Sequence, residues 1–145
     1  MKNKCSAEIE PIFTHTTFVR VRYSETDQMG TFYNSRALEW FECGRTELLR
    51  AAGLPYARLE SDGFFLPVIE AFVKYLGRAK YDDLLQLKTS MYLEGRARIK
   101  MKVEILRQED NKPVASGYTI HIFTNRDGRP VKPPTFIYEK FGIKD

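Results

Sequence analysis

The hydrophobic periodicity of this chain changes once, and that change limits the fold more than any other feature. Between residues 35 and 52, apolar residues recur every three to four positions, which predicts one amphipathic helix. Its expected apolar stripe consists of Ala37, Leu38, Trp40, Phe41, Leu48, Ala51 and Ala52. Gly53 and Pro55 follow it as a stop signal. Beyond residue 64 the apolar residues alternate instead, most strictly in ARIKMKVEIL at 97–106, and a period of two predicts strands.

Five strands are expected in all, one before the helix in FVRVRY and four after it. The later runs are FFLPVIEAFVKYL, LKTSMYLE, ARIKMKVEIL and VASGYTIHIFT. Because mostly short turns and no second helix join them, we expect an antiparallel sheet with the helix packed on one face. The sequence therefore predicts an α+β domain, a five-stranded sheet wrapped around one central helix. The 145 residues are expected to form a single domain, with 1–14 as a loose lead-in.

Two residues inside these elements have expected structural roles. Gly44 lies in the middle of the apolar stripe of the helix, where a glycine costs about 1 kcal/mol relative to alanine. We expect it to let the sheet approach closely. Pro67 lies near the start of the first strand after the helix and indicates an edge strand or a bulge there.

Composition excludes several classes of protein. No stretch reaches the ~20 apolar residues that a membrane helix needs. The lysines at the N-terminus precede no apolar run, so no secretory signal is expected. Only two cysteines are present, Cys5 and Cys43, so no disulfide framework is available and a reducing cytoplasm is the expected location.

Sequence motifs for metal, cofactor or triad chemistry are also missing. The two histidines, His15 and His121, lack the spacing of a zinc enzyme, and His121 is expected to be structural. Neither a Walker loop, a dinucleotide fingerprint nor a serine nucleophile elbow occurs. We therefore expect no metal and no cofactor. Cys43 is expected to be a small buried or half-buried residue of the helix, with a nucleophile as the less favoured alternative.

The C-terminal half of the chain is basic. From residue 75 onward there are fourteen Lys/Arg against nine Asp/Glu, which points either to an anionic partner or to an ordinary solvated surface. Arg98, Lys100 and Lys102 share one strand face, with Tyr92 on the preceding strand. RNA binding would need clustered stacking aromatics there. Because these are lacking, a solvated face with cross-strand ion pairs is the preferred interpretation.

The stretch ETDQMGTFYN, residues 25–34, joins the first strand to the helix. Its residues have a structural explanation, since Asp27 and Gly30 are typical of turns and Asn34 or Ser35 is a good N-cap. A chemical explanation is also available. Free N–H groups at a helix N-terminus stabilise a developing oxyanion, and a nearby carboxylate can attack a carbonyl or activate a water.

The run VRYSETDQMGTFYNSRALEWFECGRTELLRAAGL resembles the hotdog-fold acyl-CoA thioesterases of the 4-hydroxybenzoyl-CoA thioesterase-like family. That family has an Asp, two residues and a Gly after a strand, then an aromatic residue before the central helix. The stretches LPVIEAFVKYLGRAKYDDLLQL and FTNRDGRPVKPP are similar to it too. The resemblance covers residues 16–138 and agrees with the order of elements.

This resemblance implies roles for particular residues. It makes Asp27 the catalytic nucleophile or general base and Asn34 the residue whose backbone N–H polarises the thioester carbonyl. Many relatives have His in the place of Asn34, and a backbone role survives that difference. From the residues themselves, Gly30 is expected to shape the loop, and Tyr33 is a candidate contact of the acyl group or a core residue. Arg96 and Arg98 are the expected contacts of the coenzyme A phosphates.

The resemblance also implies partners. An acyl-CoA is the expected substrate, with homodimers or homotetramers whose active sites lie where subunits meet and whose sheets join edge to edge. An acyl-carrier-protein substrate stays open, as does a non-enzymatic module that binds acyl-CoA or RNA. Hydratases of the same architecture use an Asp/His pair, and no His lies near Asp27. Phe32, Trp40 and Phe41 could line an acyl pocket or form the core.

Overall fold

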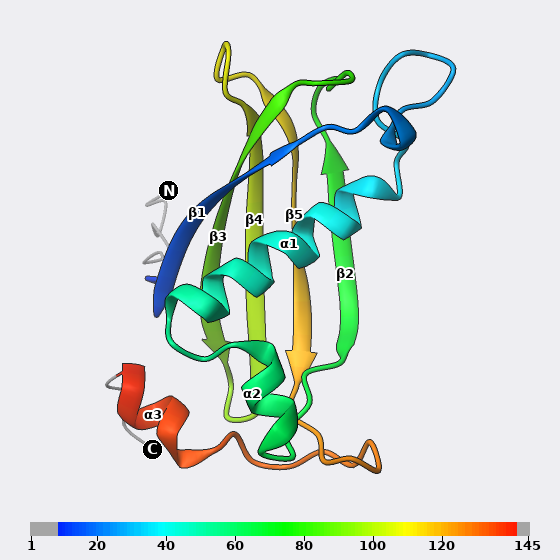
Figure 1. The fold of residues 1–145 in the computed structure, drawn as a ribbon. Coiled ribbons are helices and arrows are strands. Elements are labelled where there is room, and N and C mark those ends of the chain that lie inside the picture. The colour runs from blue at the N-terminus through cyan, green and yellow to red at the C-terminus, as the bar shows by residue number, and fades with distance from the viewer. Residues whose placement is uncertain (1–8, 142–145) are drawn as a thin grey trace, which may run out of the picture.

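The computed structural model describes residues 9–141. Its strands are β1 (Phe13–Arg20), β2 (Val68–Tyr75), β3 (Leu84–Glu94), β4 (Arg98–Arg107) and β5 (Pro113–Ile122). Its helices are the short 3-10 turn η1 (Tyr23–Glu25), α1 (Arg36–Ala51), α2 (Tyr56–Ser61) and α3 (Thr135–Phe141). All strands form one antiparallel sheet in the order β1-β3-β4-β5-β2. The curved sheet wraps around α1 (Figure 1), so the predicted fold class is confirmed.

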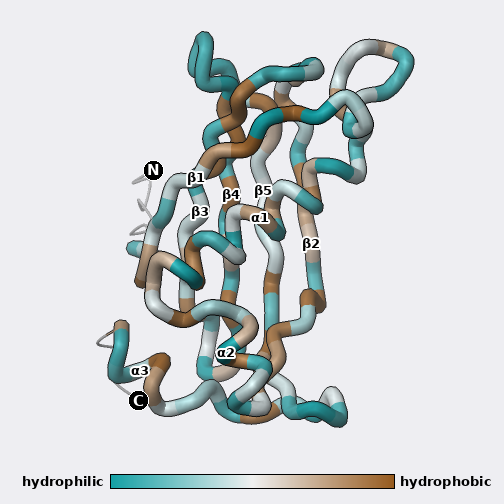
Figure 2. The backbone as a smooth tube through the Cα atoms, in the orientation of Figure 1, coloured by the Kyte–Doolittle hydropathy of each residue, from teal (hydrophilic) through white to brown (hydrophobic). Residues whose placement is uncertain are grey.

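Helix α1 crosses the sheet because one of its faces is apolar. The tube in Figure 2 shows the alternation of hydrophobic and hydrophilic residues along the strands beneath it. The predicted apolar stripe is wrong at two positions, because Leu38 and Ala51 are exposed. Leu49, which was not assigned to the stripe, is buried instead. The buried face of the helix consists of Ala37, Trp40, Phe41, Gly44, Leu48 and Leu49.

The predicted close approach at Gly44 is confirmed. A Cβ atom placed on Gly44 would clash with Oγ1 of Thr89 on β3. Thr89 is itself fully buried. The helix therefore packs against the sheet more closely at this point than a residue with a side chain would allow.

Strand β1 differs from its predicted limits. It begins at Phe13, inside the expected lead-in, and ends at Arg20, while Tyr23 belongs to η1 and is exposed. The sequence FTHTTFVR alternates half-buried with exposed positions, but His15 and Thr17 occupy two of the four half-buried ones, so its hydrophobic alternation is weak. Residues 1–8 of the lead-in lie outside the described part of the chain.

Two short helices were not predicted. Helix α2 has six residues and α3 has seven, too few turns for a helical period to be distinguished from an irregular segment. Both lie at the end of the sheet opposite the loop that precedes α1 (Figure 1). Helix α2 forms one side of a pocket described below.

Strand β2 is an edge of the sheet, as Pro67 indicated, and its pairing with β5 shifts register between Val68 and Glu70. Its neighbour on one side is β5, and among the described residues the other side has none. Large apolar side chains on or beside it are nevertheless between 43% and 50% exposed: Val68, Ile69, Phe72, Tyr75 and Leu76. An uncovered edge of this kind is a pairing surface.

Candidate functional site

The loop before α1 is a short, closed structure. The Asp27 N–H donates to the Thr31 carbonyl and the Tyr33 N–H donates to the Glu25 carbonyl, each at 2.8 Å. The Phe32 N–H donates to the Ala79 carbonyl at 2.8 Å, which ties the loop to the segment between β2 and β3. The loop is therefore held at both its ends and its side, as a site for positioned chemistry requires.

The Asp27 side chain is oriented by its own turn. Its Oδ1 accepts the Met29 N–H at 2.8 Å, and Gly30 takes a positive φ of 79° that suits glycine. Within residues 9–141, Oδ2 of Asp27 has no hydrogen-bond partner. One carboxylate oxygen thus fixes the conformation while the other is available to a water or a substrate.

The start of α1 lies directly after this loop. Ser35 is the N-cap residue, but its side chain makes no capping hydrogen bond. The Asn34 carbonyl accepts the Tyr75 hydroxyl at 2.7 Å, and the Asn34 N–H has no acceptor in the described part of the chain. The first helical N–H groups, of Arg36 and Ala37, donate to the carbonyls of Tyr33 and Asn34. The Asn34 N–H is therefore a donor available just before the helix, at the end where the helix dipole attracts negative charge.

Glu25 is a supporting residue that the sequence did not reveal. Its side chain is buried, with the residue only 4% exposed, and its Oε2 accepts the indole N–H of Trp40 at 2.9 Å. Its Oε1 accepts the Arg22 N–H at 2.7 Å. A buried carboxylate is stable only with such partners, so Glu25 locks the start of the loop to α1. Its only sequence signal was an acidic residue followed, fifteen positions later, by a tryptophan.

The other predicted site residues separate into two groups. Tyr33 lies beside Asn34 with its side chain half exposed, so it is available to a ligand at the helix start. Arg96 and Arg98 lie at the hairpin between β3 and β4, at the far end of the sheet (Figure 1). Strand β3 has 11 residues, a span of about 35 Å, so one chain does not bring these arginines to Asp27.

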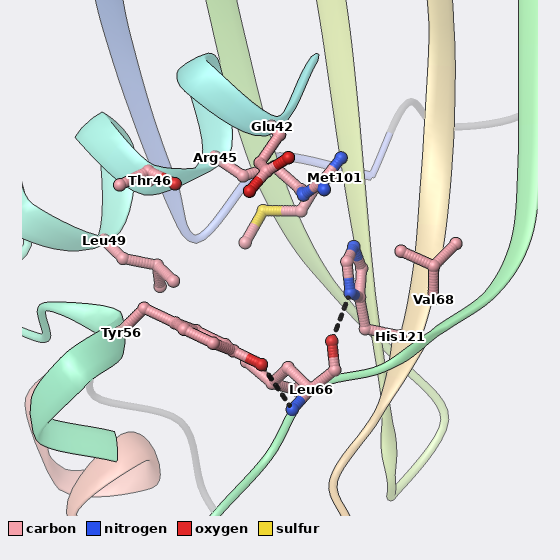
Figure 3. A pocket seen from close by; sticks show the side chains of 9 residues that line it. All are labelled: Glu42, Arg45, Thr46, Leu49, Tyr56, Leu66, Val68, Met101 and His121. Atoms are coloured by element: carbon pink, nitrogen blue, oxygen red, sulfur yellow. Dashed lines mark hydrogen bonds between the residues drawn. The ribbon is translucent and has the colours of Figure 1, made fainter. Parts of the chain in front are cut away.

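A second polar site lies between α1, α2 and the sheet (Figure 3). Here the His121 Nδ1 lies 2.9 Å from the Leu66 carbonyl and its Nε2 lies 2.8 Å from the Thr119 hydroxyl. A carbonyl only accepts, so Nδ1 carries the proton and Nε2 accepts from Thr119. The Thr119 oxygen in turn accepts an N–H of Arg45 at 3.4 Å. His121 is structural, as predicted.

The protein is expected to lose stability in acid through His121. The pKa of His121 is lowered from its usual 6.5 to about 4, mainly by burial and in smaller part by the nearby Arg45, while the hydrogen bond to the Leu66 carbonyl acts in the opposite direction. Between pH 6.5 and 4, His121 therefore binds a proton in the unfolded chain but not in the folded chain. The free energy of unfolding should fall by on the order of 3 kcal/mol over this interval.

Urea unfolding at several pH values checks this expectation. His121→Gln should remove that part of the pH dependence. His15→Gln changes the other histidine of the chain, which lies on β1, and should retain it. Identical pH profiles for the wild-type protein and His121→Gln would show that His121 is not the group responsible.

Cys43 departs from its expected burial. It is exposed on α1, and partial desolvation together with Glu42 raises the pKa of its thiol, which disfavours the nucleophilic thiolate. Among residues 9–141, no three His, Cys, Asp or Glu side chains lie together in a way that could hold a metal ion. None of the helices described there is long and apolar enough to cross a membrane.

Comparison with known proteins identifies the family. The model of the thioesterase-like superfamily matches residues 21–141. The chain belongs to this superfamily. The resemblance to hotdog-fold thioesterases is therefore confirmed. The expected enzyme class, a thioester hydrolase, is confirmed with it.

Individual members of the thioesterase superfamily show how far the similarity extends. The acyl-CoA thioesterase YbgC of Haemophilus influenzae is 36% identical over 74 residues, which are 50% of this chain and 54% of that protein. The chain thus matches about half the length of such relatives. The acyl-acyl carrier protein thioesterase ATL3 of Arabidopsis thaliana is 26% identical over 127 residues, 88% of this chain and 67% of that protein.

A solved thioesterase shares the whole fold. The DHNA-CoA thioesterase of Staphylococcus aureus superimposes with a TM-score of 0.83 at 27% identity, and the match covers 89% of each chain. The antiparallel sheet and its central helix are thus those of a known thioesterase structure.

Proposed function

We propose that this thioesterase hydrolyses acyl-CoA to a free acid and CoA at the loop that carries Asp27. The observation that carries the proposal is that one loop presents two groups without hydrogen-bond partners in the described structure, a carboxylate oxygen of Asp27 and the Asn34 N–H just before α1. A thioester carbonyl bound to this N–H is polarised, and its tetrahedral oxyanion is stabilised.

The reaction then requires no metal and no cofactor. In the general-base route, Asp27 takes a proton from water, the water oxygen forms a bond to the carbonyl carbon, and the carbon–sulfur bond breaks. The CoA thiolate leaves and takes up that proton. In the nucleophilic route, an Asp27 oxygen forms a bond to the carbonyl carbon and the carbon–sulfur bond breaks, which gives a mixed anhydride and the CoA thiolate. Water then hydrolyses the anhydride to the free acid and the Asp27 carboxylate, and the thiolate takes up the proton released. Asp27 supplies the essential carboxylate in both.

The active unit is proposed to be a dimer joined through β2, either alone or within a tetramer. A two-fold axis at Phe72 would pair β2 with its own copy in antiparallel fashion. Glu70 would then face the partner subunit's Lys74 on the same side of the joined sheet, and Ile69 would face the partner's Tyr75. This register covers the exposed apolar edge and matches opposite charges, which supports it.

The same pairing changes the position of the arginines. Antiparallel pairing reverses the partner's sheet, so the end that carries the partner subunit's Arg96 and Arg98 lies at the same end as Asp27. A role for these arginines in binding CoA phosphates is therefore proposed only across subunits.

Acyl-CoA and acyl-carrier-protein substrates are separated by a direct comparison. Rates of thiol release should be measured on the same acyl group carried by CoA and by a carrier protein. We expect CoA thioesters to be hydrolysed at least about tenfold faster, since the site needs no carrier-protein surface. Faster hydrolysis of the carrier-protein thioester would favour the activity named for the Arabidopsis relative.

A nucleic-acid-binding role has weaker support. Lys100 lies over the ring of Tyr118 with its Nζ 4.3 Å from the centroid, and Lys102 lies over Tyr92 at 5.2 Å. These contacts cover the ring faces on which bases would stack. Salt-dependent RNA binding without hydrolysis of any thioester would nevertheless favour that role. A cytoplasmic location stays a prediction that rests on the cysteine content.

A further inference from the structure

The pocket beside His121 has a polar wall and an apolar wall (Figure 3). It has a volume of about 150 Å³. Arg45 and Thr46 of α1 and His121 of β5 provide polar groups, and Leu49 and Met101 are among its apolar contacts. Cavities of about this size hold one benzene-sized group. The pocket is thus large enough for a short acyl segment with one polar end.

Arg45 is the residue of this pocket whose hydrogen bonding is incomplete. Its one hydrogen bond within residues 9–141 is the long contact to Thr119, and no carboxylate of the described residues lies within 4.0 Å of it. Thr119 and His121 use their own groups on each other and on Leu66. Arg45 therefore presents a positive charge and free N–H donors to the pocket.

The electrostatics of Arg45 point in the same direction. Burial lowers the pKa of its guanidinium, and Glu42 acts against that effect from the pocket rim. Glu42 is exposed and forms no ion pair with Arg45. A partly buried guanidinium without a counter-ion is unfavourable, and a carboxylate that binds both sides of its fork is its best partner.

We propose that this pocket binds a carboxylate at the far end of the acyl group, with Arg45 as its binding cation, so that the preferred substrates are CoA thioesters of dicarboxylic acids. The apolar wall contacts the methylenes next to that carboxylate. A methyl-terminated acyl chain of the same length would leave Arg45 desolvated without a partner, and sites that lose a polar partner discriminate strongly.

The proposal rests on the proposed thioesterase activity and on the β2 dimer. Within one chain, Arg45 lies three turns along α1 from Asn34, roughly 16 Å away. In the dimer, Ile69 faces the partner subunit's Tyr75. Within each chain, the Tyr75 hydroxyl donates to the Asn34 carbonyl at the start of α1. Val68, which lines the pocket, therefore lies next to the helix start of the partner, and the acyl group would run from there into the pocket.

A binding experiment tests the pocket without any catalysis. Glutarate is titrated into the full-length protein at pH 7 and constant ionic strength, with the uncharged diamide of glutaric acid as the control ligand. NMR signals of the two histidine rings are followed. The His121 signals should shift and saturate with glutarate, those of His15 should stay, and the diamide should have no effect.

The matched variants are two arginines of the same helix. Arg45→Met should abolish the His121 shift, whereas Arg50→Met, at an exposed arginine paired with Glu47, should retain it. Glu42→Gln should tighten glutarate binding, because it removes the competing anion. Arg45→Lys keeps the charge and should bind glutarate with intermediate affinity. It serves as the second test variant if Arg45→Met does not fold. An unchanged His121 spectrum in the wild-type protein, or a shift that persists in Arg45→Met, would overturn the proposal.

A kinetic experiment tests the substrate class. Mono-CoA thioesters of dicarboxylic acids from five to ten carbons are compared with fatty acyl-CoA of equal carbon number. We expect kcat/KM to favour the dicarboxylic thioester about 100-fold at one length or more, and Arg45→Met to remove this ratio while Arg50→Met retains it. A wild-type preference for fatty acyl-CoA at every length contradicts the proposal. If the protein hydrolyses neither series, the thioesterase activity itself is contradicted. The NMR titration then still decides whether the pocket binds a carboxylate.

Discussion

Asp27→Asn is expected to lower kcat/KM for acyl-CoA hydrolysis by a factor of about 10² to 10⁴ while the protein stays folded. Asparagine has the size of aspartate, and its side-chain oxygen can still accept the Met29 N–H that holds the loop turn. What it lacks is a basic or nucleophilic oxygen. Steady-state rates of thiol release measure the loss, and circular dichroism with thermal unfolding checks the fold.

Asp127→Asn is the matched control for this variant. Asp127 lies in the exposed turn after β5, so the change removes the same charge away from the loop and should leave kcat/KM unaltered. If Asp27→Asn retains more than about a tenth of the wild-type kcat/KM, Asp27 is not the catalytic carboxylate.

The two roles of Asp27 are separable once that loss is seen. In a single turnover in water labelled with heavy oxygen, the nucleophilic route leaves the label in the Asp27 carboxylate when water attacks the aspartyl carbon of the anhydride. The general-base route places it in the acid product. Mass spectrometry of the peptide that contains Asp27 distinguishes them.

Phe72→Glu is expected to separate the subunits and to raise the dimer dissociation constant at least about 100-fold. Phe72 is 49% exposed at the middle of the β2 edge, where it stacks on Tyr118 with ring centroids 5.6 Å apart. In the proposed register it meets its own copy on the two-fold axis. Two glutamates there would replace an apolar contact with like charges. Light scattering measures the mass, and kcat/KM should fall with it because the acyl pocket and the helix start come from different subunits.

Phe18→Glu is the corresponding control. Phe18 is 50% exposed on β1, at the opposite edge of the sheet, so the same change there should leave the β2-linked dimer intact. A monomeric wild-type protein, or a Phe72→Glu variant of unchanged mass, would contradict pairing through β2.

The local features of the fold agree with what the sequence predicted. Helix α1 runs from 36 to 51 where the sequence predicted 35 to 52, and Gly44 and Pro67 have the expected roles. These features depend on neighbouring residues in the chain, because periodicity and turn chemistry are properties of short segments. Weakly patterned segments such as FTHTTFVR and the short helices were misjudged for the same reason.

The sequence by itself determined the α+β order of elements and the loop with Asp27 and Gly30 ahead of the helix, because each is a property of consecutive residues. Only the tertiary structure decided which distant groups meet. It buried Glu25 against Trp40 and separated Arg96 and Arg98 from Asp27 along a single sheet. It also brought Arg45 to a histidine 76 positions later in the chain, through Thr119. Burial and pairing across the sheet set those contacts, so they cannot be predicted from the pattern of residues along the chain.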